Sequence, residues 1–170
     1  MGIEWSPGPG RAYAPGMRAH FTPAERADAG EILTLSRGAY VSEAQIYGDP
    51  HLPPLTESVE EVAKAIVEIH VLKTVLNGRI VAAGRARQEE GVLHLGRLAV
   101  APDMQGRGLA SQLVTALEAL AAPGTEHFEL FTGAKSGPNL RLYRRLGYEE
   151  SRRGPGRPGI ELVYLRKRVL

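Results

Sequence analysis

The clearest hydrophobic pattern lies in the middle of the chain, where apolar and polar positions alternate. Segments 70–76, 79–88 and 92–100 each follow a period of two, which is typical of β-strands with one buried face. Asn77-Gly78 separates the first two segments, and both central positions of a tight hairpin turn need the positive φ that Asn and Gly adopt readily. Glu89-Glu90-Gly91 provides the second turn. The pattern predicts an antiparallel meander of three strands.

Two helices are predicted before this meander. A short strand, Met17–Phe21, leads into Thr22-Pro23-Ala24-Glu25, which combines a capping box with a proline at the first helical position. Apolar residues then recur at helical spacing as far as Tyr40. Residues 41–56 contain three prolines and a glycine, so we expect a loop, with a short helical piece at its start as the alternative. Ser58-Val59-Glu60-Glu61 is a second capping box that opens the next helix.

The rest of the chain alternates between helical and strand patterns. The predicted elements are a helix over 105–121, a buried strand at 128–131, a short helix over 138–146, a strand from 148, a loop at 152–159 and a last strand at 160–165. A strand, a helix and a strand in succession imply a right-handed crossover and a parallel pair. The expected order is therefore β-α-α-β-β-β-α-β-α-β-β, an α/β fold with a central mixed, mostly antiparallel sheet flanked by helices.

Length and composition indicate one globular domain. The chain has 170 residues, of which 43% are apolar and 24% charged, and these values are ordinary for such a domain. Residues 1–16 carry three prolines and no core pattern. We expect an N-terminal extension over 1–16, followed by a single domain over 17–170.

Several classes of function are disfavoured by the composition. The chain has no cysteine, and its five histidines lack the spacing of metal ligands, so we expect neither disulfides nor a metal. It has no run of 18 apolar residues and no secretory signal pattern, so we expect a cytoplasmic protein that does not span a membrane. The net charge of +2 is too small to indicate nucleic acid by itself.

The strongest chemical motif lies between the third strand of the meander and the following helix. It reads Gln105-Gly106-Arg107-Gly108-Leu109-Ala110 and is followed by Ser111. N–H groups at a helix start have no intrahelical partners and lie at the positive end of the helix dipole, which suits a pyrophosphate. Gly106 and Gly108 have no Cβ to hold the backbone away from phosphate oxygens, and Arg107 could add a charged contact. A helix cap without a ligand is the alternative.

On these residues the chain resembles the GNAT superfamily of N-acetyltransferases. The family's acetyl-CoA motif is Gln or Arg, two residues, Gly, one residue, then Gly or Ala, and Gln105, Gly108 and Ala110 match every fixed position. Asn139–Tyr148 carries the second part of the resemblance, and the order of elements matches over roughly residues 17–168. The resemblance implies an enzyme that transfers an acetyl group from acetyl-CoA, its co-substrate, directly to a primary amine of a small molecule, protein or peptide.

The resemblance also implies roles for individual residues. The strand Leu98-Ala99-Val100 would splay from strand 128–131 and pair with the pantetheine arm, while one of its N–H groups holds the oxyanion. The backbone from Gln105 to Ser111 would bind the diphosphate. Asn139 would hydrogen-bond the cofactor, and Tyr143, four residues later on the same helix face, would protonate the leaving thiolate. A core tyrosine is the alternative for Tyr143.

The general base is less clearly indicated. Some relatives carry a glutamate six residues before the last valine of the cofactor strand, and His94 occupies that position here. Histidine titrates in a suitable range, so His94 is the predicted base. Glu43 and Glu57 are rivals, and a structural histidine with water chains in place of a base is the remaining alternative.

The acceptor side is expected over residues 40–57, by the topology of the resembled family. Residues 43–61 carry five acidic side chains and no Lys or Arg, and the resulting charge would attract an amine or polyamine. We predict that Glu43 and Tyr47 bind the acceptor. A solvated loop before a capped helix is the alternative.

Two other functions stay open. A catalytically silent acyl-CoA-binding or sensing domain would keep both cofactor motifs. A nucleic-acid binder would use the basic residues of 141–170, although the few aromatic residues on the strands argue against it. We expect a small-molecule amine or peptide as partner, no nucleic acid and no membrane, and a homodimer because dimers are common in the resembled family.

Overall fold

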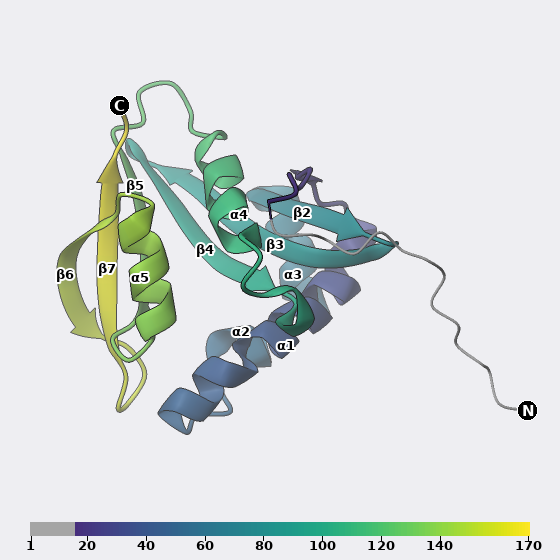
Figure 1. Ribbon diagram of the computed structural model, residues 1–170, viewed down its shortest axis with the longest axis horizontal. Helices are drawn as coiled ribbons and strands as arrows, with labels where there is room; N and C mark the ends of the chain where they lie inside the picture. Colours follow the sequence, from purple (N-terminus) through teal and green to yellow (C-terminus); the bar gives the residue numbers. More distant parts are fainter. Residues whose placement is uncertain (1–15) are drawn as a thin grey trace, which may run out of the picture.

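The computed structural model describes residues 16–170, which form a seven-stranded mixed sheet with helices on both faces (Figure 1). The strand order is β1-β2-β3-β4-β5-β7-β6. The strands are β1 (Thr22–Pro23), β2 (His70–Leu76), β3 (Arg79–Glu89), β4 (Val92–Val100), β5 (His127–Gly133), β6 (Glu149–Pro155) and β7 (Glu161–Arg168). The helices are α1 (Ala29–Tyr47), α2 (Pro53–Thr56), α3 (Val59–Glu68), α4 (Leu109–Glu118) and α5 (Gly137–Arg145), with 3-10 turns η1 (Arg26–Asp28) and η2 (Pro102–Met104).

This arrangement confirms the predicted α/β fold and the order of its main elements, to which α2 is added. The expected N-terminal extension lies, apart from Gly16, outside the described residues. No helix among residues 16–170 is long and apolar enough to cross a membrane.

The predicted meander is confirmed as β2, β3 and β4, which pair antiparallel in succession. The first turn places Asn77 at φ 52° and Gly78 at φ 74°, as the hairpin dipeptide requires. The second turn uses Glu90 at φ 41° and Gly91 at φ 77° in the same way. The turn residues and the alternation of apolar and polar positions therefore predict the same structure over residues 70–100.

The predicted start of the first helix is wrong. Residues 17–21 form no strand, and Thr22 and Pro23 pair with β2 instead of capping the helix. The capping box lies three residues later, where the Glu25 N–H donates to Asp28 Oδ2 at 2.7 Å. Lys73 of β2 also binds this carboxylate. Pairing with β2 occupies the expected cap, so the chain turns into the helix only after it leaves the sheet.

The predicted loop over residues 41–56 is also partly wrong, because α1 continues to Tyr47. The prolines of this segment all follow Gly48, and the helix ends there, with Gly48 in the left-handed conformation at φ 60°. The alternative of a helical piece at the start of the segment is closer to the structure. The second capping box is confirmed, since Glu61 N–H donates to Ser58 Oγ at 3.1 Å.

Two boundaries differ in the C-terminal half. The helix predicted over 105–121 begins only at Leu109, because Gly106 and Gly108 adopt φ 75° and 83° and keep the chain out of the helical region. The loop predicted over 152–159 is shortened, since β6 continues to Pro155. An edge strand pairs on one side only, so it tolerates the glycine and proline that suggested a loop.

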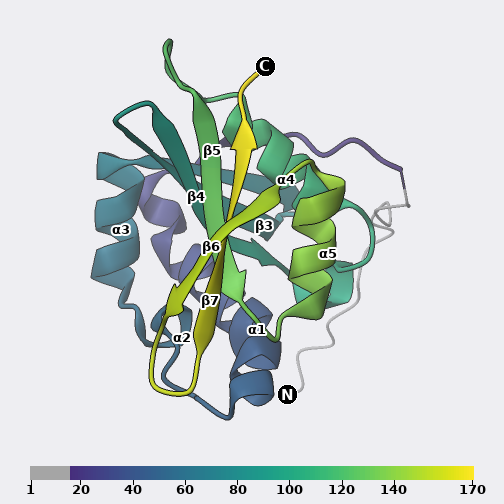
Figure 2. The same ribbon diagram turned by 90° about the vertical axis from the view of Figure 1, so that its left-hand side faces the viewer.

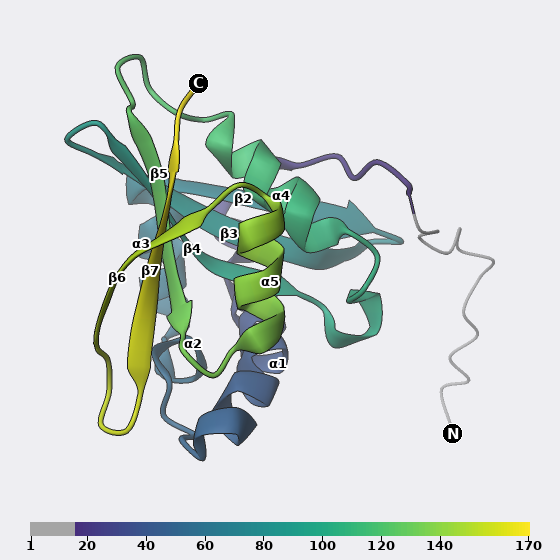
Figure 3. The ribbon, with the colours of Figure 1, turned by 60° about the vertical axis from the view of Figure 1, so that its left-hand side comes forward.

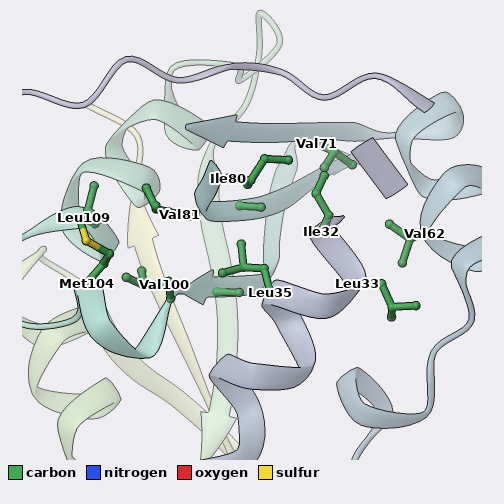
Figure 4. Packing of buried hydrophobic residues seen from close by; sticks show 14 of the residues in the cluster. Ile32, Leu33, Leu35, Val62, Val71, Ile80, Val81, Val100, Met104 and Leu109 are labelled. Atoms are coloured by element: carbon green, nitrogen blue, oxygen red, sulfur yellow. The ribbon is translucent and has the colours of Figure 1, made fainter. Parts of the chain in front are cut away.

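The core consists of two apolar clusters, one on each face of the sheet. Figure 2 shows α4 and α5 on one side of the strands and α2 and α3 on the other. Residues of α1 and α3 pack on one face of the meander, as Ile32, Leu35 and Val62 do in Figure 4. On the other face, α4 and α5 cover β4, β5 and β7, and the fully buried members there include Leu93, Leu113, Leu117, Tyr148, Val163 and Leu165.

One glycine permits the close contact between α4 and the sheet. A Cβ at Gly84 would lie 2.8 Å from the Leu98 side chain and 3.1 and 3.2 Å from those of Leu117 and Leu113. We expect Gly84→Ala to lower the free energy of unfolding by about 1–3 kcal/mol, because the surrounding leucines must move. Urea denaturation monitored by circular dichroism measures this difference.

Gly96→Ala is the matched control on the neighbouring strand, where a Cβ would meet nothing within 4 Å. We expect the urea concentration at the midpoint of unfolding to be close to that of the wild type. Equal midpoints for the Gly84 and Gly96 variants would contradict the packing argument.

Candidate functional site

The parallel pair of β4 and β5 separates along its length (Figure 3). Only the first three residues of β4 pair with β5, and His94 opposite Glu129 is the last pair. Beyond it, residues 95–100 of β4 and 130–133 of β5 are no longer partners. The expected splay is present, and it leaves backbone groups of β4 without a β5 partner, so that an extended ligand could pair with them as an added strand.

A β-bulge lies in the separated part of β4. The β3–β4 register shifts between Ala83 and Arg85, so that Arg97 and Leu98 together face Gly84. Arg97 takes a φ of 50°, which is uncommon for a residue with a side chain. The bulge sends the two side chains to different faces: Leu98 packs against the cluster beneath α4, and Arg97 lines a cavity beside α1.

The glycine motif follows β4 directly and forms an exposed backbone surface. A Cβ at either Gly106 or Gly108 would meet nothing within 4 Å, so the space over this backbone is open. The first backbone hydrogen bond into α4 runs from Gln112 N–H to Gly108 O at 3.2 Å. The N–H groups of Leu109, Ala110 and Ser111 precede that bond, at the positive end of the helix. This geometry suits a diphosphate.

Gln105 has a different position from the glycines. Its side-chain amide donates to the carbonyl oxygen of Val100 at 3.3 Å and so joins the motif to the end of β4. The side chain of Arg107 is partly buried. Within the motif, the backbone rather than the long side chains therefore provides the open donors.

The second predicted element lies on α5, across the gap from β4. The Asn139 side chain donates to Thr132 Oγ1 of β5 at 3.3 Å. Tyr143 is buried, with 6% of its surface exposed, and its ring meets that of Tyr148 edge-on at 6.2 Å between centroids. Burial, with smaller effects from Tyr40 and Glu43, raises the pKa of Tyr143 well above its usual value. The hydroxyl therefore keeps its proton at neutral pH.

The end of α1 crosses the gap and contacts the β5–α5 connection. The Ser136 hydroxyl donates to Glu43 Oε1 at 2.5 Å, and the Lys135 N–H donates to the Tyr47 hydroxyl at 2.9 Å. A Cβ at Gly133 would overlap the Tyr47 hydroxyl, so this glycine makes room for the ring. The structure thus brings the predicted acceptor residues Glu43 and Tyr47 to the site, where both also have partners within the chain.

A buried charge cluster lies beside the bulge. Both oxygens of Glu57 accept hydrogen bonds from Arg85, at 2.8 and 2.9 Å, and the two side chains are only 9% and 14% exposed. The Arg97 Nε lies 3.7 Å from Glu57 Oε2. Burial raises the pKa of the nearby Tyr40 to about 12, against a lowering by Arg97. Glu57 is a candidate base, but both of its carboxylate oxygens already accept hydrogen bonds from Arg85.

His94 lies at the closed end of the β4–β5 pair. Its Nδ1 is 3.5 Å from Glu129 Oε1, and its Nε2 is 3.9 Å from Glu89 Oε2. Because side chains alternate along β4, His94 faces away from the cluster that contains its neighbours Leu93 and Leu95, and Tyr143 belongs to that cluster. The structure does not bring His94 and Tyr143 together, and a role as base stays a prediction.

Sequence reasoning missed Arg97 as a site residue. One feature could have revealed it, namely the polar Gly96-Arg97 step, which interrupts the alternation of an otherwise regular strand. Among residues 16–170, no three histidine or acidic side chains form a group that could hold a metal ion.

Comparisons with known proteins agree with this geometry. Residues 67–150 match a family model described as an acetyltransferase (GNAT) domain. A 76-residue stretch is 36% identical to a mycothiol acetyltransferase from Clavibacter michiganensis subsp. michiganensis (strain NCPPB 382) and covers 44% of this chain. The match covers 25% of that relative, so the chain spans about a quarter of its length.

Solved structures share the fold. The ribosomal-protein-S18-alanine N-acetyltransferase from Escherichia coli superposes with a TM-score of 0.71 at 20% identity, over 89% of this chain and 94% of that one. The PaiA N-acetyltransferase from Thermoplasma acidophilum was solved in complex with coenzyme A. It superposes with a TM-score of 0.70 at 12% identity, over 90% of this chain and 100% of that one.

The charge cluster leads to a stability prediction. Glu57→Gln leaves Arg85 buried without its carboxylate, and we expect the free energy of unfolding to fall by about 3 kcal/mol. Glu60→Gln, an exposed position in the first turn of α3, is the control and should change it by less than about 0.5 kcal/mol. Urea unfolding of both variants measures the difference. If the free energy of unfolding falls as little for Glu57→Gln as for Glu60→Gln, the Glu57–Arg85 ion pair is solvated and does not stabilise the fold.

Proposed function

We propose that this chain, which belongs to the GNAT family of acetyltransferases, is an N-acetyltransferase that moves an acetyl group from acetyl-CoA to a primary amine of a small molecule or peptide. The observation that carries the proposal is the opened edge of β4, which ends in a glycine-rich helix start and whose Leu98 packs in the same apolar cluster as Tyr143. A cytoplasmic location and a homodimer stay predictions from the sequence and the resemblance.

The binding of acetyl-CoA is supported by the open backbone of the glycine motif. The N–H groups from Gly106 to Ser111 would hold the diphosphate, and Arg107 would lie beside it. The free edge of Leu98–Val100 would hold the pantetheine arm, and Asn139 would bind from the α5 side. When bound, acetyl-CoA supplies an acetyl group activated as a thioester.

The reaction needs one proton acceptor and one proton donor. The amine nitrogen forms a bond to the carbonyl carbon while the carbon–sulfur bond breaks, and a backbone N–H of β4 stabilises the oxyanion between these events. Tyr143 gives its proton to the leaving thiolate, which is consistent with a hydroxyl that burial keeps protonated. The proton lost by the amine goes to the base.

Glu43 is the better placed of the candidate bases. Its carboxylate is close enough to Tyr143 to influence that hydroxyl, and Ser136 holds it at the end of α1. His94 lies between Glu129 and Glu89, where β4 and β5 remain paired. A catalytically silent acyl-CoA-binding domain would need neither an acid nor a base, and a buried tyrosine hydroxyl that keeps its proton, with the Glu43 carboxylate near enough to affect it, argues against such a domain.

Gly108→Glu tests the phosphate site. A carboxylate there would repel the diphosphate, and we expect the dissociation constant for acetyl-CoA to rise by about 100-fold or more. Gly124→Glu is the matched control, because both glycines have a left-handed φ, 83° and 84°, and open space beyond Cα. Isothermal titration calorimetry with acetyl-CoA measures both, and equal affinities would refute the assignment of the loop.

Tyr143→Phe tests the acid. We expect kcat to fall by about 100-fold with the affinity for acetyl-CoA unchanged, because only proton donation is removed. Tyr148→Phe is the control, since this hydroxyl donates to Glu118 at 2.7 Å and serves packing. Thiol release at saturating acetyl-CoA measures kcat, and wild-type turnover of the Tyr143 variant would remove it from the mechanism. The same assay on Glu43→Gln and His94→Gln identifies the base as the residue whose loss lowers kcat more.

A further inference from the structure

Two acidic side chains on the acceptor side are paired with arginines. Glu57 binds Arg85 through both oxygens, and Asp49 accepts a hydrogen bond from Arg157 of the β6–β7 turn at 2.7 Å. Glu43 accepts a hydrogen bond from a buried serine. The sequence suggested attraction of a polyamine by these carboxylates, but two of them are matched by arginines from distant elements.

Two arginines, Arg85 and Arg97, lie beside the Glu57 carboxylate at the same place. The single charge of Glu57 is shared between Arg85, which binds it, and Arg97, whose Nε stays 3.7 Å away. Within residues 16–170, the Arg97 guanidinium makes no hydrogen bond, and its Nε is both buried and unpartnered. A guanidinium carries five donors in a planar fork that matches the two oxygens of a carboxylate.

The surroundings of Arg97 leave one direction of approach for a ligand. On its inner side, the buried and unpartnered Ser36 Oγ and the Arg97 Nε line a cavity of about 10 Å³, the size of a single water. On its outer side, 30% of the Arg97 side chain is exposed. A ligand larger than water therefore meets Arg97 from the surface, next to Tyr40.

An aromatic pair lies on the same face of the sheet, across the gap. Phe131 of β5 is 54% exposed, and its ring centroid is 5.5 Å from that of Tyr164 on β7. Gly133, two residues after Phe131 on the same side of β5, contacts Tyr47 of α1, which places this pair on the α1 face. The Arg152 guanidinium lies 3.4 Å above the Tyr164 ring and adds a second positive charge.

We propose that the acceptor is an amino-acid-like molecule, which carries a carboxylate as well as the reacting amine, and that Arg97 determines this specificity by binding the carboxylate. The Arg97 side chain leaves β4 one residue before Leu98–Val100, the segment to which the acetyl-CoA thioester is assigned, so a bound carboxylate would hold its amine near the reacting carbon. The exposed Phe131–Tyr164 pair would contact the rest of the molecule. This inference rests on the proposed acetyltransferase function.

The test compares acceptors that differ only in the carboxylate. Thiol release from acetyl-CoA is measured with the twenty amino acids, with their carboxamides and with spermidine. We expect kcat/KM for the preferred amino acid to exceed that for its carboxamide by about 10- to 100-fold, the range of a charge-assisted hydrogen-bond pair. Preference for the carboxamides or for spermidine would overturn the proposal.

Variants of Arg97 locate the effect. Arg97→Gln should reduce kcat/KM for the amino acid by a similar factor, mainly through KM, and leave the carboxamide unchanged. Arg97→Lys keeps the positive charge but not the planar pair of donors. Its kcat/KM for the amino acid should lie between those of the wild type and of Arg97→Gln. Arg87→Gln is the control, because Arg87 is exposed on β3 and pairs with Glu89. Should Arg97→Gln fail to fold, the comparison of amino acids with their carboxamides on the wild-type protein still tests whether the acceptor needs a carboxylate.

Calorimetry with acetyl-CoA separates this proposal from the one on which it rests. Failure of the wild-type protein to bind acetyl-CoA would overturn the transferase function itself. Binding of acetyl-CoA with a kcat/KM for amines that lack a carboxylate equal to or above that for every amino acid, or with no acetylation of any amino acid, would overturn only the acceptor class.

Discussion

The separation of β4 from β5 after three residue pairs is the constraint on which the rest of the structure depends. Inside a sheet, strands normally satisfy each other's N–H and C=O groups, so an opened edge is stable only where water or a ligand can reach it. Two features lie next to this edge. The bulge at Arg97 falls in the part of β4 that no longer pairs with β5, and Gly84 lets α4 pack closely over it. The proposed binding site for acetyl-CoA would thus be part of the sheet itself rather than a set of loops added to it.

The opening also brings together two parts of the chain that the sheet would otherwise separate. Helix α1 packs on one face and α5 on the other, and only across the gap can residues of both meet. Glu43 at the end of α1 binds Ser136 just before α5, and the same carboxylate influences Tyr143. Because the proposed acid on α5 and the proposed acceptor side on α1 share this one gap, a shift of either helix would change the distance between acetyl donor and acceptor. The contacts between α1 and the β5–α5 connection therefore position the chemistry as much as they stabilise the fold.

The parts of the fold that the sequence predicted well are those decided locally. Strands β2 to β4 follow from alternation and from turns that need Asn or Gly, and the glycine motif has its effect within a few residues. The predictions are wrong where partners that are distant in the sequence determine the local structure. Thr22 has a good capping sequence, yet pairing with β2 takes it into the sheet. The pairing of the acceptor-side carboxylates is hidden from the sequence for the same reason, since Glu57 meets its partner Arg85 from a strand 28 residues away. No local pattern contains that information.

The buried charges beside the bulge are hard to explain by stability alone. Removing Glu57 and Arg85 from water carries a penalty that apolar side chains of similar volume would avoid, so a buried ion pair is weak evidence of a stabilising role. Arg97 adds to this cost, because it brings a second positive charge to the Glu57 carboxylate and leaves a buried Nε without a hydrogen bond. An anionic group bound from outside would complete the charge balance of this cluster. The carboxylate of the proposed amino-acid-like acceptor would supply that group at the exposed part of the Arg97 guanidinium.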